Sequence, residues 1–407
     1  MKGRIFYLIG AILSLSFFTH SIYAGEIKIG ALVSISGSIS SSGQESKTAL
    51  DIASNDINDY LRSIGSEEQV ELIIFDTKAS PDVALAKLKE LADQGIKIVI
   101  GPMTSSEVEK CKSFADKNGI ILISQSSTAP TLAIPNDNVF RLVPDDEQQA
   151  EVVAKLMEKD EIRFIIPFWR DDLWGNNLVS ATKSQFTAIG GKVGKDVKYD
   201  VKTTDFSSKL KELNSEVEKA IKMYGNNGVG VYLISLNEVS DIFKEAQKYD
   251  ALSKVKWYGS DGTALADVLV EDKDVAAFAQ KVRFINPLYS GDITEARFRV
   301  DERVKAKLGR KPDSYAYAAY DALWIATTSI IMTGNTDDIK ALKTAINKTA
   351  NTYYGVTGWT ALNEAGDRDN GNYSFWAVEK INGAFKWDNI AKFVYDPALE
   401  GIVIYLK

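Results

Sequence analysis

The feature that most constrains this chain is a stretch, residues 96–130, in which two short apolar runs each end in a hydroxyl-rich loop. Ile96–Ile100 predicts a buried parallel strand that stops at Gly101-Pro102. Ile120–Ser124 predicts a second strand, which leads into Ser126-Ser127-Thr128. In open α/β sheets, small ligands bind beyond the carboxyl ends of such strands, so both loops are candidate ligand contacts.

A helix is predicted between these two strands. Thr104 and Glu107 have the spacing of a capping box, which marks a helix start, and Asn118-Gly119 offers a left-handed end. Backbone N–H groups at a helix start, together with hydroxyls, suit a carboxylate better than a cation.

The rest of the chain repeats this alternation of apolar strands and amphipathic helices. The pattern predicts parallel sheets covered by helices on both faces. With 407 residues, the chain is longer than one hydrophobic core usually serves, so two lobes are expected. From Val356 onward the pattern changes to strands and hairpins, with a turn at Asn382-Gly383.

The first 24 residues have the pattern of a secretory signal peptide. Lys2 and Arg4 precede an apolar run, Ile5–Phe18, which is too short to span a bilayer, and Ile22-Tyr23-Ala24 is a suitable cleavage site. We expect removal after Ala24, no lipid anchor because no cysteine follows the run, and a periplasmic or extracellular location. The formal charge would change from −7 to −9, which argues against nucleic-acid partners.

Two residue types restrict the chemistry of the chain. The one histidine, His20, lies within the predicted signal peptide, which argues against histidine-based catalysis and histidine-ligated metal sites. The one cysteine, Cys111, falls on a helix at core-like spacing and is interpreted as a small buried apolar residue. No nucleophile motif or phosphate loop is evident. We therefore expect no enzyme activity, metal or cofactor.

Several motifs in a fixed order resemble those of one family: GALVSISGSISSSGQ, GPMTSSEV, ISQSSTAPTL, RDDLWGNNL, YGSDGTA and VTGWTALNEAGDR. The chain is similar along nearly its whole length to the leucine/isoleucine/valine-binding proteins that serve ABC importers of amino acids. The resemblance implies two Rossmann-like lobes joined by three crossovers, with a ligand cleft between them. Lobe 1 would comprise residues 25–142 and 286–356, and lobe 2 residues 143–285 and 357–407.

The resemblance also implies a set of ligand contacts. Ser105 and Thr128 would each donate a hydroxyl and an amide to the α-carboxylate of an amino acid, with Ser126 offering its backbone. Asp261, on the other lobe, would accept from the α-ammonium. Each charged hydrogen bond of this kind contributes about 1.5–3 kcal/mol.

Further residues would form the pocket walls by the same resemblance. They are Ser42, Met103, Thr104, Trp174 and Tyr315. Trp174 replaces a tyrosine that is frequent in the family, which reduces the pocket volume. Leu236 stands where relatives have a ligand-contacting tyrosine, so either one ammonium contact is missing or the pocket is more apolar.

Structural interpretations compete with these roles. Ser105 fits the first turn of a capped helix, and Asp261 fits an ordinary Ser-Asp-Gly turn. Trp174 and Tyr315 fit core aromatic positions. The functional interpretation is favoured because Ser105, Thr128 and Asp261 all follow predicted strands on opposing lobes.

The sequence therefore predicts a monomeric binding protein that captures a small amino acid, of the neutral or branched-chain type, and delivers it to an ABC permease. Two alternatives stay open: a sensor ectodomain of the same fold, and a ligand such as an amide or urea.

Overall fold

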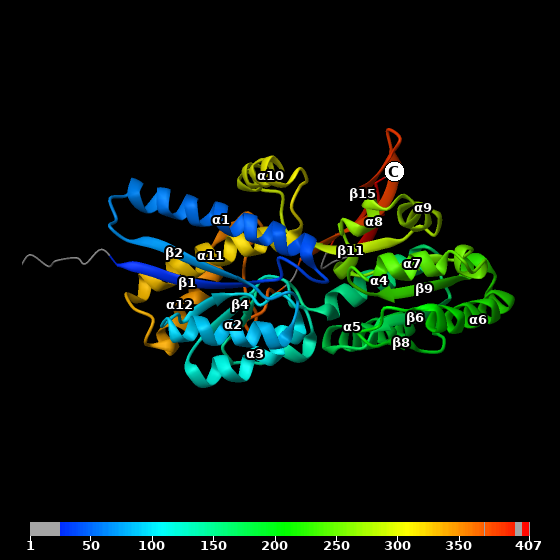
Figure 1. The fold of residues 1–407 in the computed structure, drawn as a ribbon, viewed down its shortest axis with the longest axis horizontal. Coiled ribbons are helices and arrows are strands. Elements are labelled where there is room, and N and C mark those ends of the chain that lie inside the picture. The colour runs from blue at the N-terminus through cyan, green and yellow to red at the C-terminus, as the bar shows by residue number, and fades with distance from the viewer. Residues whose placement is uncertain (1–24, 370, 395–400, 407) are drawn as a thin grey trace, which may run out of the picture.

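The computed structural model describes residues 25–369, 371–394 and 401–406. The predicted signal peptide, residues 1–24, lies outside them. The described chain forms two lobes side by side along the long axis of the molecule, as Figure 1 shows. No helix in the described ranges is long and apolar enough to cross a bilayer.

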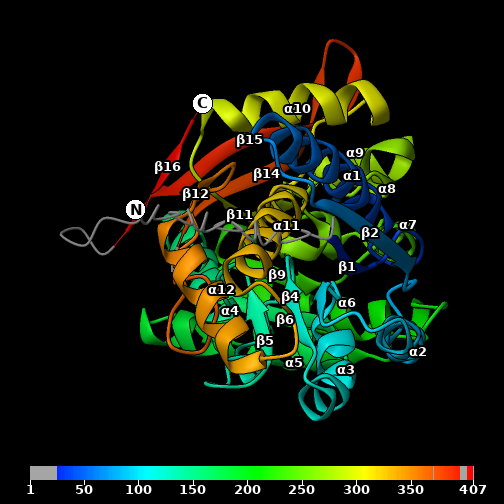
Figure 2. The ribbon, with the colours of Figure 1, turned by 90° about the vertical axis from the view of Figure 1, so that its left-hand side faces the viewer.

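Lobe 1 is built on a five-stranded parallel sheet in the order β2-β1-β3-β4-β5. Its strands are β1 (Glu26–Val33), β2 (Gln69–Asp76), β3 (Ile98–Ile100), β4 (Ile121–Ser124) and β5 (Val139–Arg141). One face packs against α1 (Ser40–Ser63), α11 (Ser314–Thr333) and α12 (Ile339–Thr352), and the other against α2 (Pro81–Asp93) and α3 (Ser105–Asn118). Figure 2 shows the two helical layers. α10 (Glu295–Leu308) packs on the outer side of α1.

Lobe 2 is built on a nine-stranded mixed sheet in the described part of the chain. Its order is β16-β15-β14-β11-β10-β9-β6-β7, with β8 also paired to β6. The parallel part comprises β6 (Phe164–Arg170), β7 (Lys192–Val193), β8 (Val197–Tyr199), β9 (Val229–Ile234), β10 (Lys256–Tyr258) and β11 (Ile285–Ser290). The antiparallel part comprises β14 (Asn372–Ile381), β15 (Ala384–Val394) and β16 (Ile402–Tyr405).

Helices cover both faces of this second sheet. α4 (Asp146–Lys159) and α5 (Leu173–Ala188) pack on one face. α6 (Ser207–Tyr224), α7 (Val239–Ala246), α8 (Val268–Glu271) and α9 (Lys273–Lys281) pack on the other. The α/β fold with parallel-sheet cores confirms the sequence prediction.

The helix that was predicted after the first hydroxyl-rich loop is α3. Thr104 and Glu107 form the predicted capping box, and Gly119 ends the helix in the left-handed region with φ of 60°. Cys111 is fully buried on this helix, and burial raises the pKa of its thiol to about 12. The structural interpretation of Cys111 is therefore confirmed.

Two crossovers lie later in the chain than predicted. β11 pairs with β14 over Ile285–Ser290, so the return to lobe 1 at residue 286 is wrong and follows Ser290 instead. The short hairpin of β12 (Tyr354–Gly355) and β13 (Gly358–Trp359) precedes an isolated bridge from Asp367 to Arg141 of lobe 1. The chain therefore stays with lobe 1 beyond residue 356, and the tail joins the second sheet at Asn372.

Candidate functional site

One cavity lies between the lobes, and most of the predicted ligand-binding residues line it. Its walls include nine of the ten predicted residues: Met103, Thr104, Ser105, Ser126, Thr128, Trp174, Leu236, Asp261 and Tyr315. Further lining residues are Ser38, Ile39, Ala79, Pro81 and Ser106 from lobe 1, and Arg170, Asp172, Val201 and Gly262 from lobe 2.

Ser42 is the predicted wall residue that does not line this cavity. It lies in the first turn of α1, and its hydroxyl interacts with the carboxylate of Asp313. Burial raises the pKa of Asp313 to about 6, and the Ser42 hydroxyl partly offsets this rise. Ser42 is therefore placed to support the start of α11 rather than to contact a ligand in this cavity.

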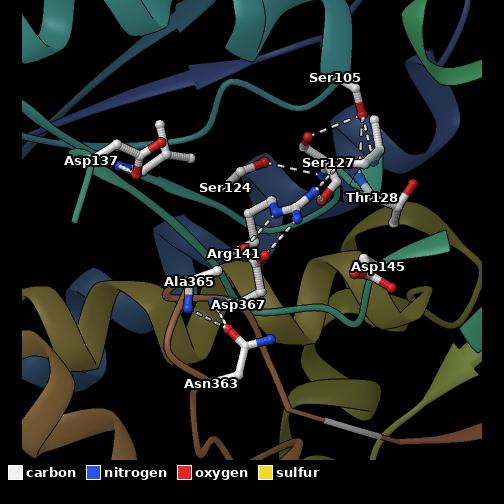
Figure 3. A network of polar contacts seen from close by, with 12 residues as sticks. Ser105, Ser124, Ser127, Thr128, Asp137, Arg141, Asp145, Asn363, Ala365 and Asp367 are labelled. Carbon is white, nitrogen blue, oxygen red and sulfur yellow. Dashed lines mark hydrogen bonds and ion pairs between the residues drawn. The ribbon is translucent and has the colours of Figure 1, made fainter. Parts of the chain in front are cut away.

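Ser105 joins the two hydroxyl-rich loops of lobe 1. Its Oγ accepts from the backbone N–H groups of Thr128 and Ala129, each at 3.2 Å, and from the Ser127 hydroxyl at 3.0 Å. Figure 3 shows this cluster. Because the Ser105 oxygen accepts in all three contacts, its own O–H remains available as a donor. The Thr128 amide, in contrast, is directed at Ser105.

The other lobe 1 hydroxyls also hold the loops in place. Ser126 Oγ donates to the carbonyl of Met103 at 2.8 Å, and Ser124 Oγ donates to the carbonyl of Pro102 at 2.6 Å. The Thr104 hydroxyl is engaged with Glu107 in the capping box. These bonds fix the backbone of both loops before any ligand contact is made.

A buried arginine supports the second loop from behind. Arg141 Nη1 donates to the carbonyl of Ala129 at 2.7 Å, and Nε and Nη2 bind the two carboxylate oxygens of Asp367 at 2.5 and 2.6 Å. Figure 3 shows Arg141 between the loop and Asp367. Neither residue was predicted. A charged residue inside the apolar strand VFRLV was the available signal.

On lobe 2, Asp261 is held by three hydrogen bonds. Its Oδ1 accepts from Gln149 Nε2 at 2.9 Å, its Oδ2 accepts from the Tyr315 hydroxyl, and its backbone N–H donates to Gln149 Oε1 at 2.9 Å. Because Tyr315 belongs to lobe 1, this contact crosses the cleft. Burial raises the pKa of the Asp261 carboxyl.

A second buried carboxylate, Asp146, was not predicted as a site residue. The sequence indicated only that Asp145, Asp146 and Glu147 start a helix. In the structure, Asp146 Oδ1 accepts from the same Gln149 Nε2 at 2.8 Å, Oδ2 has no partner at hydrogen-bond geometry among the described residues, and the nearby Thr128 hydroxyl favours the ionised carboxylate. Burial, followed by the nearby Asp261 charge, raises the pKa of Asp146 well above its usual range.

The apolar wall of the cavity is close-packed around Gly262. A Cβ at Gly262 would lie 2.5 Å from the Trp174 ring and 2.7 Å from Leu236 Cδ2. Glycine is therefore required for these two side chains to meet at this point. Leu236 lies on the cavity surface, so the wall is apolar where a tyrosine was expected from the resemblance.

Arg170 and Asp172 line the same cavity and were not predicted to do so. Arg170 is buried and donates to Asp172 Oδ2 at 2.6 Å and to Glu238 Oε1 at 2.7 Å. Asp172 also caps α5 through the N–H of Gly175 at 2.8 Å. The acidic pair Asp171-Asp172 fits an ordinary exposed loop edge in sequence, but Asp172 belongs to a partly buried ion pair with Arg170.

Comparison with known proteins shows which protein family the chain belongs to. The family described as periplasmic binding protein matches residues 26–380. The chain is 32% identical over 369 residues to an uncharacterised protein of Methanocaldococcus jannaschii, covering 86% of this chain and 87% of the relative. It is 24% identical over 366 residues to the Leu/Ile/Val-binding protein BraC3 of Rhizobium johnstonii, covering 88% and 94%.

Solved structures with the same fold hold different ligands. The substrate-binding protein LivJ of Streptococcus pneumoniae, in complex with isoleucine, matches with a TM-score of 0.70 at 19% identity, covering 94% of this chain and all of that one. A solute-binding protein of R. palustris, in complex with benzoate, also matches with a TM-score of 0.70, at 21% identity, covering 92% and 99%.

Fold and cleft together define a two-lobed solute-binding protein. The chain belongs to the periplasmic binding protein family, and its resemblance to the leucine/isoleucine/valine-binding proteins is confirmed. The family and the fold are those of substrate-binding proteins rather than enzymes.

Proposed function

We propose that this protein captures a small amino acid, of the neutral or branched-chain type, outside the cytoplasm and delivers it to the permease of an ABC importer. The observation that carries this proposal is the arrangement of opposite polarity across one cavity. Lobe 1 presents Ser105 and Thr128, whose hydroxyls suit a carboxylate. Lobe 2 presents Asp261, which suits an ammonium.

The same arrangement supports an amine-bearing ligand over a simple aromatic acid. Two buried carboxylates, Asp146 and Asp261, lie within hydrogen-bond reach of one amide group. A benzoate-type ligand brings no positive charge to them, whereas the ammonium of an amino acid does. The apolar wall of Trp174 and Leu236 fits a side chain without charge.

Thermal-shift measurements test this function directly. A ligand that binds only the folded protein raises the melting temperature by mass action. We expect leucine, isoleucine, valine or a smaller neutral amino acid to raise it, and benzoate, urea and acetamide to leave it unchanged. A shift with benzoate or urea and with none of the twenty amino acids would reject the proposal.

A further inference from the structure

The two acids at the lobe 2 side of the cleft form an unusual pair. Gln149 Nε2 donates to Asp146 Oδ1 at 2.8 Å and to Asp261 Oδ1 at 2.9 Å. The two oxygens therefore lie no more than about 6 Å apart, a separation at which like charges oppose each other's ionisation. One neutral amide cannot compensate two negative charges.

Among the described residues, the charged and titratable groups found beside the pair include no cation. They are Asp145 at the start of α4, Tyr315 from α11, Tyr232 from β9 and Tyr373 from β14. All of these are acidic or neutral. Arg170, the lining cation of the same cavity among the described residues, is already paired with Asp172 and Glu238.

Asp146 is the more deeply buried of the two acids. Asp146 is fully buried, and its Oδ2 has no partner at hydrogen-bond geometry among the described residues, although the nearby Thr128 hydroxyl partly offsets the rise in the pKa of this carboxyl. Its backbone N–H donates to the carbonyl of Thr128 at 2.9 Å, so Asp146 is held against the loop that is proposed to bind the ligand carboxylate. Gln149 Nε2 lies between the two acids, and of the pair Asp261 lines the cavity, so a ligand ammonium would meet Asp261 with the Asp146 carboxyl directly behind it.

We propose that Asp146 and Asp261 share one proton in the ligand-free protein, and that the ammonium group of the ligand replaces this proton when it binds. The carboxyl O–H bond breaks, the proton passes to solvent, and the ammonium then donates to Asp261 while the charge of the buried Asp146 behind it attracts the ammonium. One positive charge leaves the site and one enters. This inference rests on the proposed amino-acid ligand and adds Asp146 as a second negative charge that acts on the ammonium.

The direction of the pH dependence follows from this exchange. Because burial raises the pKa of both carboxyls, and the Asp261 charge raises that of Asp146 further, the pair holds its proton at a higher pH than an ordinary aspartate. Below that raised pKa, each binding event displaces one proton, so affinity falls up to tenfold for each unit of decreasing pH. Above it, affinity does not depend on pH. An anionic ligand without an amine would show the opposite slope.

Calorimetry of the mature protein with L-leucine measures the released protons when each pH is run in two buffers that both titrate there and differ in ionisation enthalpy, such as MES and piperazine near pH 5.5 and phosphate and Tris near pH 7.5. We expect a release approaching one proton per leucine at the acidic end of a pH 5–8 series. In Asp146→Asn we expect weaker binding with the release abolished. Asp241→Asn, which removes an exposed acid of the same lobe, should behave like the wild type. A binding enthalpy that is equal in both buffers throughout the series would overturn the proposal.

Carboxyl ¹³C NMR titration of the ligand-free protein separates this proposal from the amino-acid function. We expect one carboxyl of the pair to titrate well above an ordinary aspartate, and the Asp261 carboxyl to return toward the ordinary range in Asp146→Asn, whose fold is checked by circular dichroism. If both carboxyls titrate as ordinary aspartates, the shared proton is rejected. If leucine gives no heat while the raised titration is present, the amino-acid function fails and the shared proton stands.

Discussion

The two sides of the cleft differ in the charge of the side chains that line it and in how those side chains are held. On lobe 1, Ser105 accepts from two loop amides, Ser126 donates to the Met103 carbonyl, and Arg141 supports the second loop from behind. On lobe 2, Asp146 and Asp261 share a single amide donor group. The lobe 1 residues that line the cavity are therefore uncharged and held by hydrogen bonds, whereas the lobe 2 lining includes charged side chains. We infer that lobe 1 fixes the orientation of a ligand and that lobe 2 selects for its positive charge.

The largest expected effect concerns the support of the lobe 1 side. Arg141→Leu leaves the Asp367 carboxylate buried without its partner, which should lower the free energy of unfolding by about 3–5 kcal/mol. Urea denaturation measures this. Arg303→Leu is the matched control, because it breaks a partly exposed ion pair with Asp56 that should contribute about 0–1 kcal/mol. Equal losses in the two variants would show that Arg141 does not hold the loop.

The next largest effect concerns the charged side. Asp261→Asn retains the shape of the side chain but removes a charge that is proposed to bind the ammonium. We expect leucine affinity to fall by about 100-fold, equivalent to roughly 3 kcal/mol, in calorimetry. Asp241→Asn again controls for loss of an exposed acid. Unchanged affinity in Asp261→Asn would remove this residue from the site.

Substitution in the apolar wall of the cavity should reduce leucine affinity by an intermediate amount. Gly262→Ala brings a methyl group into Trp174 and Leu236, and such overpacking typically costs about 1–3 kcal/mol. We expect lower leucine affinity, with partial recovery in the double variant Gly262→Ala/Leu236→Ala. Gly228→Ala is the control, because its Cβ would meet Tyr224 at an ordinary 3.4 Å. If Gly262→Ala binds leucine like the wild type, the wall is less tightly packed than described.

The smallest effect should come from one lobe 1 hydroxyl. Ser105→Ala removes a donor to the ligand carboxylate and an acceptor for two loop amides, but the backbone N–H groups remain. We expect a loss of leucine affinity of about 1 kcal/mol, or five- to tenfold. Ser113→Ala, on the exposed side of the same helix, should change nothing. A loss in Ser105→Ala larger than that in Asp261→Asn would reverse the proposed difference between the two sides.

Local signals explain which parts of the fold could be predicted. The capping box of α3 and the turn at Asn382-Gly383, where both residues have positive φ, depend on residues within three positions of each other. The second crossover was placed too early because β11 owes its extent to pairing with β14, a strand far along the chain. A pairing between strands so far apart in the sequence does not change the hydrophobic periodicity of the short apolar segment, so the extent of β11 could not be predicted from that segment.

The same distinction applies to the site. Ser105, Thr128 and Asp261 follow strands, so they could be found from strand ends and from the family resemblance. Asp146 could not, because at a helix start an acidic residue is an ordinary favourable choice. Its second role depends on Gln149 reaching Asp261, 112 residues away. Ser42 does not line the cavity, and its partner, Asp313 at the start of α11, lies even further along the chain, so sequence spacing could not indicate this contact.

The central claim is that the cleft recognises both ends of a zwitterion. Calorimetry with leucine, with 4-methylpentanoate and with 3-methylbutylamine tests it most directly, because the three ligands share one side chain and differ in their charged groups. We expect leucine to bind and each single-charge analogue to bind at least 100-fold more weakly. Binding of 4-methylpentanoate as tight as that of leucine would contradict the claim, since that ligand offers nothing to Asp146 and Asp261.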